Sequence, residues 1–177
     1  MPSATPTGTV VWFTGLPSAG KTTIANLVAK RLEHAGVPYE VLDGDVVRTH
    51  LSKGLGFSKA DRDENIRRIG FVAGLLARHG VTVLVSAISP YRDVRDEIRA
   101  TVDGFVEVHV ATSLATCQAR DVKGLYAKHA RGELRGLTGV DDPYEAPLDP
   151  ELVLRTEDDS PEASAERVLA YLAGDAR

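Results

Sequence analysis

The sequence predicts an α/β domain in which a parallel sheet of five strands carries helices on both faces. Three observations lead to this prediction. Strand-like apolar runs alternate with helical segments along the chain. The apolar runs are nearly continuous, which is typical of parallel strands that are covered on both sides. The chain has 177 residues, 43% of them hydrophobic, which suits one domain with a substantial core.

The predicted elements follow one another in a regular order. Short apolar runs predict strands at 9–14, 39–42, 82–86, 106–110 and 152–155. Apolar residues at helical spacing predict helices at about 23–32, 58–79, 91–102, 113–121 and 161–173. Gly36 ends the first helix, and Ser58 followed by Asp61 is close to a capping pattern at the start of the second. Ligands of such sheets bind beyond the carboxyl ends of the strands, so the polar residues that follow each strand are the functional candidates.

A glycine-rich loop joins the first strand to its helix. Residues 15–22 read GLPSAGKT, which has the G-x-x-x-x-G-K-T spacing of a phosphate-binding loop. Gly15 and Gly20 let backbone amides approach phosphate oxygens. Lys21 reaches the β- and γ-phosphates, and the Thr22 hydroxyl can ligate the Mg²⁺ that bridges them. Because a strand precedes the loop and a helix follows it, the pattern predicts a P-loop NTPase fold rather than a simple glycine turn.

Composition narrows the class of protein. The net charge of −4 argues against a nucleic-acid-binding protein, whose surface would be broadly basic. The single cysteine, Cys117, cannot form an internal disulfide, which fits a reducing compartment, and it is interpreted as a packing residue. Residues 1–8 are polar and lack the features of a signal peptide, so we expect a flexible tail before one domain at 9–177. The apolar stretch 69–88 is interrupted by charged residues, so we expect no membrane span and a cytoplasmic enzyme.

Two carboxylates follow the second predicted strand. Asp43 and Asp45 stand there with Arg48 close behind. One acid could hold Mg²⁺, and the other could orient or deprotonate an attacking oxygen. The alternative is that Asp45 caps the helix that follows. The third strand ends without an acid but with Ser89, which could contact substrate, could carry phosphate, or could be a turn or cap residue.

The next helix carries polar residues near its start. Arg62 and Asn65 fall on one helical face, so the first turns of this helix can reach the site. Phe57 precedes the helix and can stack on a base, or it can form a hydrophobic staple that holds the helix start.

Residues 120–144 are rich in basic side chains and glycine, and they do not have the composition of core. This segment predicts a mobile lid over phosphates at about 122–147, although a solvated helix face is the alternative.

Together these strings resemble the adenylyl-sulfate kinase family over about residues 9–154. The matching stretches are 15–23, 42–48, 55–58, 61–62, 64–70, 88–92, 120–126 and 138–147. The resemblance implies that ATP phosphorylates the 3′-hydroxyl of adenosine 5′-phosphosulfate (APS), giving 3′-phosphoadenosine 5′-phosphosulfate (PAPS) and ADP. It also implies ATP and Mg²⁺ as cofactors, a homodimer, and no nucleic-acid or membrane partner.

The resemblance implies a set of site residues. The APS-binding residues would be Asp45, Arg48, Phe57, Arg62, Asn65, Ile88, Ser89, Lys123, Gly136 and Leu137. The ATP-binding residues would be Gly15, Leu16, Pro17, Ser18, Ala19, Gly20, Lys21, Thr22, Thr23 and Arg120, with the adenine near Arg120 and residues 142–147. The catalytic residues would be Lys21, Asp45, Ser89 and Lys123, and the Mg²⁺ ligands Thr22 and Asp43. Ser89 matches a serine assigned as a phosphoserine intermediate, but in-line attack on the γ-phosphate requires no such intermediate.

Two residues depart from the family pattern. Val46 stands where the family has Asn, and Leu137 stands where it usually has Phe. Leucine lacks the stacking contribution of an aromatic ring, so we expect weaker APS binding than in a typical member. Two alternative functions use the same loop. One is a kinase for another small molecule, such as a sugar, a shikimate-like acid or an antibiotic. The other is a nucleotide-dependent switch or a catalytically silent binding module.

Overall fold

The computed structural model describes residues 8–174; residues 1–7 of the predicted tail lie outside this range. All five strands form one parallel sheet in the order β2-β3-β1-β4-β5. The strands are β1 (Val10–Thr14), β2 (Tyr39–Asp43), β3 (Thr82–Ser86), β4 (Phe105–Val110) and β5 (Leu152–Leu154). Within the central pairs, Val11 is in register with Leu84 on one side and Val106 on the other. The predicted fold class is confirmed, and each strand lies within a few residues of its predicted bounds.

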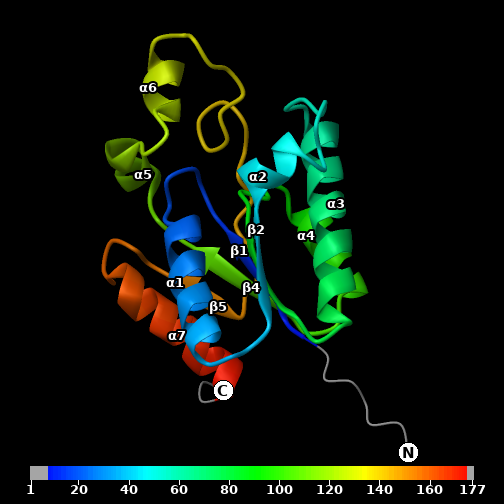
Figure 1. Ribbon diagram of the computed structural model, residues 1–177. Helices are drawn as coiled ribbons and strands as arrows, with labels where there is room; N and C mark the ends of the chain where they lie inside the picture. The colour runs from blue at the N-terminus through cyan, green and yellow to red at the C-terminus, as the bar shows by residue number, and fades with distance from the viewer. Residues whose placement is uncertain (1–7, 175–177) are drawn as a thin grey trace, which may run out of the picture.

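Helices cover both faces of the sheet (Figure 1). Helices α1 (Lys21–His34) and α7 (Pro161–Ala173) pack on one face, and α3 (Lys59–Ala77) and α4 (Arg92–Thr101) pack on the other. Alternate residues of β1 supply the two core layers, since Val11 and Phe13 belong to the α1 side and Val10 and Trp12 to the α3 side. This arrangement explains why the strand is apolar at every position. No helix within residues 8–174 has the length and apolarity needed to cross a membrane.

Three short helices lie at the carboxyl end of the sheet (Figure 1). They are α2 (Gly44–Thr49), α5 (Leu114–Arg120) and α6 (Leu125–Ala130). The cap of α2 differs from the alternative considered for Asp45, because the Asp43 carboxylate accepts the Asp45 amide at 2.9 Å and is itself the cap. The predicted cap at Ser58 is confirmed, since its hydroxyl accepts the Asp61 amide.

The lid segment, residues 122–147, contributes to the core. Tyr126 and Leu137 are buried in the cluster that also contains residues of α1 and α7. The interpretation that this stretch is not core is therefore wrong at these two positions. A composition dominated by basic side chains concealed two apolar contacts that depend on tertiary packing.

Candidate active site

A cavity of about 800 Å³ opens at the carboxyl end of the sheet, where the phosphate loop, α2, α3 and the lid segment meet. Its lining contains most of the predicted site residues: Pro17, Ser18, Gly20, Lys21, Thr22, Thr23, Asp43, Asp45, Arg48, Phe57, Arg62, Asn65, Ile88, Ser89, Arg120, Lys123, Gly136 and Leu137. Residues far apart in the sequence thus face one volume, and this volume is large enough for small-molecule ligands.

The phosphate loop is shaped by close backbone packing. A Cβ atom on Gly15 would lie 2.6 Å from the carbonyl oxygen of Val110, so only glycine fits there. Gly20 has a φ of 107° at the N-terminus of α1, where glycine is again favoured. The loop therefore ends at a helix N-terminus whose free amides and dipole attract an anion.

Lys21 lies over the loop that precedes it. Its ammonium donates hydrogen bonds to the carbonyl oxygens of Gly15 at 3.0 Å and Leu16 at 2.8 Å. Burial lowers the pKa of Lys21 to about 8. Lys123 lowers it further, whereas Asp45 and Asp43 act in the opposite direction. A desolvated cation held at this point favours a bound polyphosphate, because the anion offsets the cost of burying the charge.

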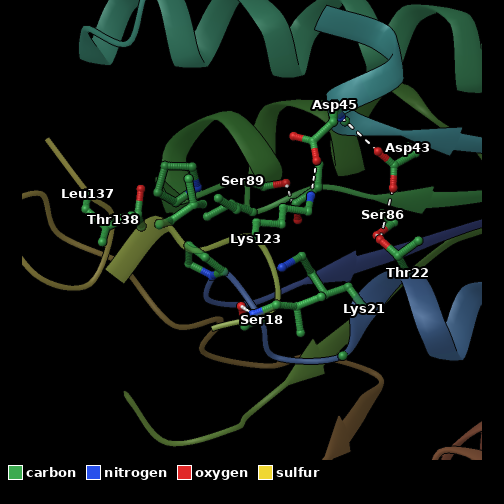
Figure 2. Close-up of a pocket in the computed structure, with 18 of the residues that line it drawn as sticks. Ser18, Lys21, Thr22, Asp43, Asp45, Ser86, Ser89, Lys123, Leu137 and Thr138 are labelled. Carbon is green, nitrogen blue, oxygen red and sulfur yellow. Dashed lines mark hydrogen bonds and ion pairs between the residues drawn. The ribbon is translucent and has the colours of Figure 1, made fainter. Parts of the chain in front are cut away.

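Oxygen atoms from three elements meet beside the loop. The Thr22 hydroxyl donates to an Asp43 carboxylate oxygen at 2.9 Å and lies 3.0 Å from the Ser86 hydroxyl oxygen (Figure 2). Carboxylate and hydroxyl oxygens are the hard ligands that Mg²⁺ prefers, so these residues fit the predicted ion. Ser86 was missed by sequence reasoning, although its place as the last residue of β3 is a usable signal.

Asp45 and Lys123 both line the cavity and form an ion pair (Figure 2). Both side chains are more than half exposed. The chain next to Lys123 is joined to the phosphate loop at two points. The Val122 amide donates to the Ser18 hydroxyl at 3.2 Å, and the Tyr126 hydroxyl donates to the carbonyl of Pro17 at 3.0 Å. The base of the lid segment is therefore attached to the loop that would carry the phosphates.

Phe57 presents an open ring next to two arginines. The residue is 65% exposed, and the Arg48 and Arg62 guanidinium carbons lie 4.6 and 5.5 Å from the centroid of its ring. The position that would complete a hydrophobic staple is occupied by Arg62, which donates to the Phe57 carbonyl. These contacts contradict the staple alternative and are compatible with base stacking.

Three further polar residues line the same cavity: Arg62 and Asn65 of α3, and Thr138 of the lid segment. Arg62 donates to the carbonyl of Gly136 at 2.7 Å and forms an ion pair with Asp142. The side-chain oxygens of Asn65 and Thr138 are buried and have no hydrogen-bond partner among residues 8–174. Buried polar atoms usually have partners, so these two oxygens are suited to a ligand. Thr138 was not among the predicted residues.

Ser89 lies in the turn between β3 and α4. Its φ is 48°, and its hydroxyl accepts the Trp12 indole N–H at 2.9 Å and donates to the Ala87 carbonyl at 3.3 Å. The residue is almost fully buried, and Tyr91 rather than Ser89 is the cap of α4. The turn alternative thus describes Ser89 better than the cap. A hydroxyl engaged in two hydrogen bonds is poorly placed to accept a phosphoryl group.

Arg120 is the last residue of α5 and lines the cavity. Its guanidinium donates to the hydroxyl and the carbonyl of Thr156, both at 2.7 Å, and Thr156 lines the cavity with Pro161. Residues 142–147 are absent from the lining, and the Glu145 amide donates instead to the Pro90 carbonyl. The part of the adenine prediction that relied on this stretch has no support from their placement.

Comparisons with known proteins agree with this geometry. The sequence profile of the family described as Adenylylsulphate kinase matches residues 7–155. An adenylyl-sulfate kinase of Picosynechococcus is 59% identical over 165 residues, which is 93% of each chain. The structure of the Mycobacterium tuberculosis APS kinase CysC in complex with AMPPNP and APS has a TM-score of 0.91 at 46% identity, covering 95% of this chain and 99% of that one.

A hexameric APS kinase from Thiobacillus denitrificans has a TM-score of 0.72 at 38% identity; the match covers 99% of this chain and 31% of that one. A shikimate kinase from Aquifex aeolicus, at 13% identity and a TM-score of 0.53, shares the fold alone. The phosphate loop, the cavity that adjoins it and these matches lead to one conclusion: the chain belongs to the adenylylsulphate kinase family.

Proposed function

We propose that the chain transfers the γ-phosphate of ATP to the 3′-hydroxyl of APS, giving PAPS and ADP, within the cavity described above. The observation that carries this proposal is that one cavity joins a phosphate loop to a second ligand surface made by Arg48, Phe57, Arg62 and Asn65. An ATP-hydrolysing switch needs no such second surface. The phosphate loop and these residues thus support a transferase with two nucleotide ligands.

The phosphate-loop side holds ATP. The backbone amides of residues 15–23, except Pro17, which has no N–H, contact the phosphates, Lys21 neutralises the β- and γ-phosphates, and Arg120 lies where the adenine would be. Thr22 and Asp43 would hold Mg²⁺, with Ser86 adjacent. The bound ion would supply positive charge that neutralises the charge developing on the phosphates during transfer.

The α2–α3 side holds APS. Phe57 stacks on the adenine, and Leu137 packs against it from the lid segment. Arg48, Arg62 and the orphan oxygen of Asn65 supply charge and hydrogen bonds to the rest of the nucleotide.

Asp45 lies where the two ligands meet. Its carboxylate orients the 3′-hydroxyl and takes its proton, while the oxygen forms a bond to the γ-phosphorus and the bond from that phosphorus to the bridging oxygen of ADP breaks. Lys123 stabilises the transferring charge when the lid segment closes. The proton then leaves Asp45 for solvent, which its exposure allows. Ser89 acts as part of the APS-binding wall and is not a phosphorylated intermediate.

We further expect a homodimer that works in the cytoplasm. Light scattering of the purified protein measures the oligomeric state, and fractionation of the source cells measures the compartment.

The decisive experiment measures ADP release with ATP and Mg²⁺, with and without APS, and identifies PAPS by mass spectrometry. A panel of sugars and shikimate tests the alternative kinases. Release that is equal with and without APS would contradict the proposal, and transfer to a panel member alone would support another kinase.

A further inference from the structure

A buried arginine outside the cavity lining connects the Ser89 turn, which lines the cavity, to the end of the lid segment. Arg95, on α4, is 1% exposed, and its guanidinium makes three short hydrogen bonds. Nε donates to a Glu107 carboxylate oxygen at 2.7 Å, Nη1 to the Ser89 carbonyl at 2.5 Å and Nη2 to the Glu145 carbonyl at 2.7 Å. A planar fork that serves three acceptors fixes their relative positions, which a lysine ammonium cannot do.

The first carbonyl belongs to the APS-binding wall. Ser89 adopts a φ of 48°, in the left-handed region that residues other than glycine rarely enter. Such a conformation persists only where the surroundings hold it. Here Trp12 holds the side chain from the sheet, and Arg95 holds the backbone carbonyl from α4.

The second carbonyl lies at the end of the lid segment. The Glu145 amide donates to the Pro90 carbonyl at 2.8 Å. The adjacent Tyr144 hydroxyl lies 3.0 Å from the Thr14 hydroxyl oxygen, which donates to the Ile88 carbonyl at 2.7 Å. The returning end of the lid segment is thus joined to the Ser89 turn directly and through Arg95.

The ion pairs behind Arg95 fix it in place. Glu107 accepts Arg95 on one carboxylate oxygen and Arg99 on the other, and Arg99 also bonds Glu151. A buried ion pair is often no more stabilising than apolar residues of equal volume, so stability alone gives little reason for a charge here. The two carbonyl contacts provide a geometric reason.

We propose that Arg95 is a positioning residue for APS: it holds the Ser89 turn and the end of the lid segment in one fixed relation, and so sets the shape of the APS wall without touching substrate. This inference rests on the proposed function. None of the three acceptors of Arg95 belongs to the phosphate loop. The loss of the Arg95 guanidinium should therefore raise the KM for APS far more than the KM for ATP.

The test compares Arg95→Lys with Arg99→Lys. The first keeps a cation beside Glu107 but loses the fork. The second makes the same change in the same cluster, at a residue whose described polar contacts are Glu107 and Glu151 only. For Arg95→Lys we expect the KM for APS to rise about tenfold or more, as for the loss of a charge-assisted hydrogen bond. The KM for ATP of Arg95→Lys should stay within about twofold of the wild-type value. For Arg99→Lys, the KM for APS and the KM for ATP should both stay within that range.

Tyr144→Phe removes the hydroxyl that faces Thr14, which is the second link between the end of the lid segment and the Ser89 turn. It therefore tests the fixed relation between these two segments even if Arg95→Lys fails to fold. It should raise the KM for APS by at least about twofold, with the KM for ATP unchanged. The inference would be overturned if folded Arg95→Lys, or Tyr144→Phe where Arg95→Lys does not fold, kept the wild-type KM for APS. It would also be overturned if the KM values for APS and ATP rose equally. If the wild type makes no PAPS, the proposed function itself fails; if it makes PAPS and the variant keeps its APS constant, only the role of Arg95 fails.

Discussion

Replacing Asp45 with Asn separates catalysis from stability. The Asp45 side chain is 68% exposed, and its described side-chain partner is Lys123. Exposed ion pairs contribute about 0.2–1 kcal/mol, so the melting temperature of Asp45→Asn should fall by no more than about 4 °C. Asparagine has nearly the same shape and still offers an oxygen to Lys123. The APS pocket should therefore remain intact.

The effect on turnover should be much larger. A positioned general base contributes about 10²–10⁴-fold to a rate, which corresponds to about 2.7–5.4 kcal/mol of activation free energy. Asparagine cannot take the proton from the 3′-hydroxyl at neutral pH. We therefore expect kcat to fall by at least about 100-fold while the KM for APS changes by less than about threefold, because the change removes an interaction that matters in the transition state.

Steady-state kinetics with a coupled ADP assay measure both constants, and calorimetry measures APS binding without turnover. Lys123→Met is the matched control for stability, since it breaks the same ion pair from the other side. A wild-type kcat in Asp45→Asn would refute the role of this carboxylate. A loss confined to the KM for APS would make Asp45 a binding residue only.

Five other predictions concern the phosphate loop and the rest of the cavity. The pKa of Lys21 is lowered to about 8 from 10.5, and bound phosphates favour its charged form, so ATP affinity should weaken above about pH 8 and ATP binding there should take up a proton, as calorimetry in two buffers can detect. Between those two pKa values the unfolded chain binds more protons at Lys21, so this group should make the ligand-free protein more stable as pH rises, which melting curves check. Leu137→Phe should tighten APS binding by about 0.5–1.5 kcal/mol, about 2- to 13-fold in Kd, and an unchanged Kd would contradict the stacking argument. Chelation of Mg²⁺ should abolish turnover, and Thr22→Val should raise the Mg²⁺ concentration for half-maximal activity by about tenfold or more, with failure to do so removing Thr22 from the ligand set. Gly15→Ala should lower stability by about 1–3 kcal/mol in chemical denaturation, because its Cβ would lie 2.6 Å from the Val110 carbonyl oxygen; a stable variant would show that the loop can shift.

The sheet could be predicted from the sequence because the apolar pattern of each strand agrees with the burial of that strand in the structure. A strand such as β1 is buried at all five positions, and its β-branched and aromatic residues predict that state. Short polar helices were harder to predict from the sequence. The six residues of α6 contain Lys128 and His129, and only the burial of Tyr126 against the phosphate loop reveals why the segment is ordered.

Site residues were predictable where chemistry follows a strand. Asp43, Asp45 and Lys21 could be identified from their positions, and they do line one cavity. Arg95 and Glu107 could not. Each looks like a solvated charge in its own segment, and their partnership arises only when α4 packs on β4.

The sheet places the cavity and the two ends of the described chain far apart. The lid segment and α6 lie at one end of the molecule, whereas the start of β1 and the end of α7 lie at the other (Figure 1). A second domain or an affinity tag joined at either point would leave the nucleotide entrance clear. The match to the Thiobacillus chain covers 31% of that chain, so the matching region there is one part of a longer polypeptide. The protein could therefore be fused to another enzyme, or immobilised through either end, without covering the cavity.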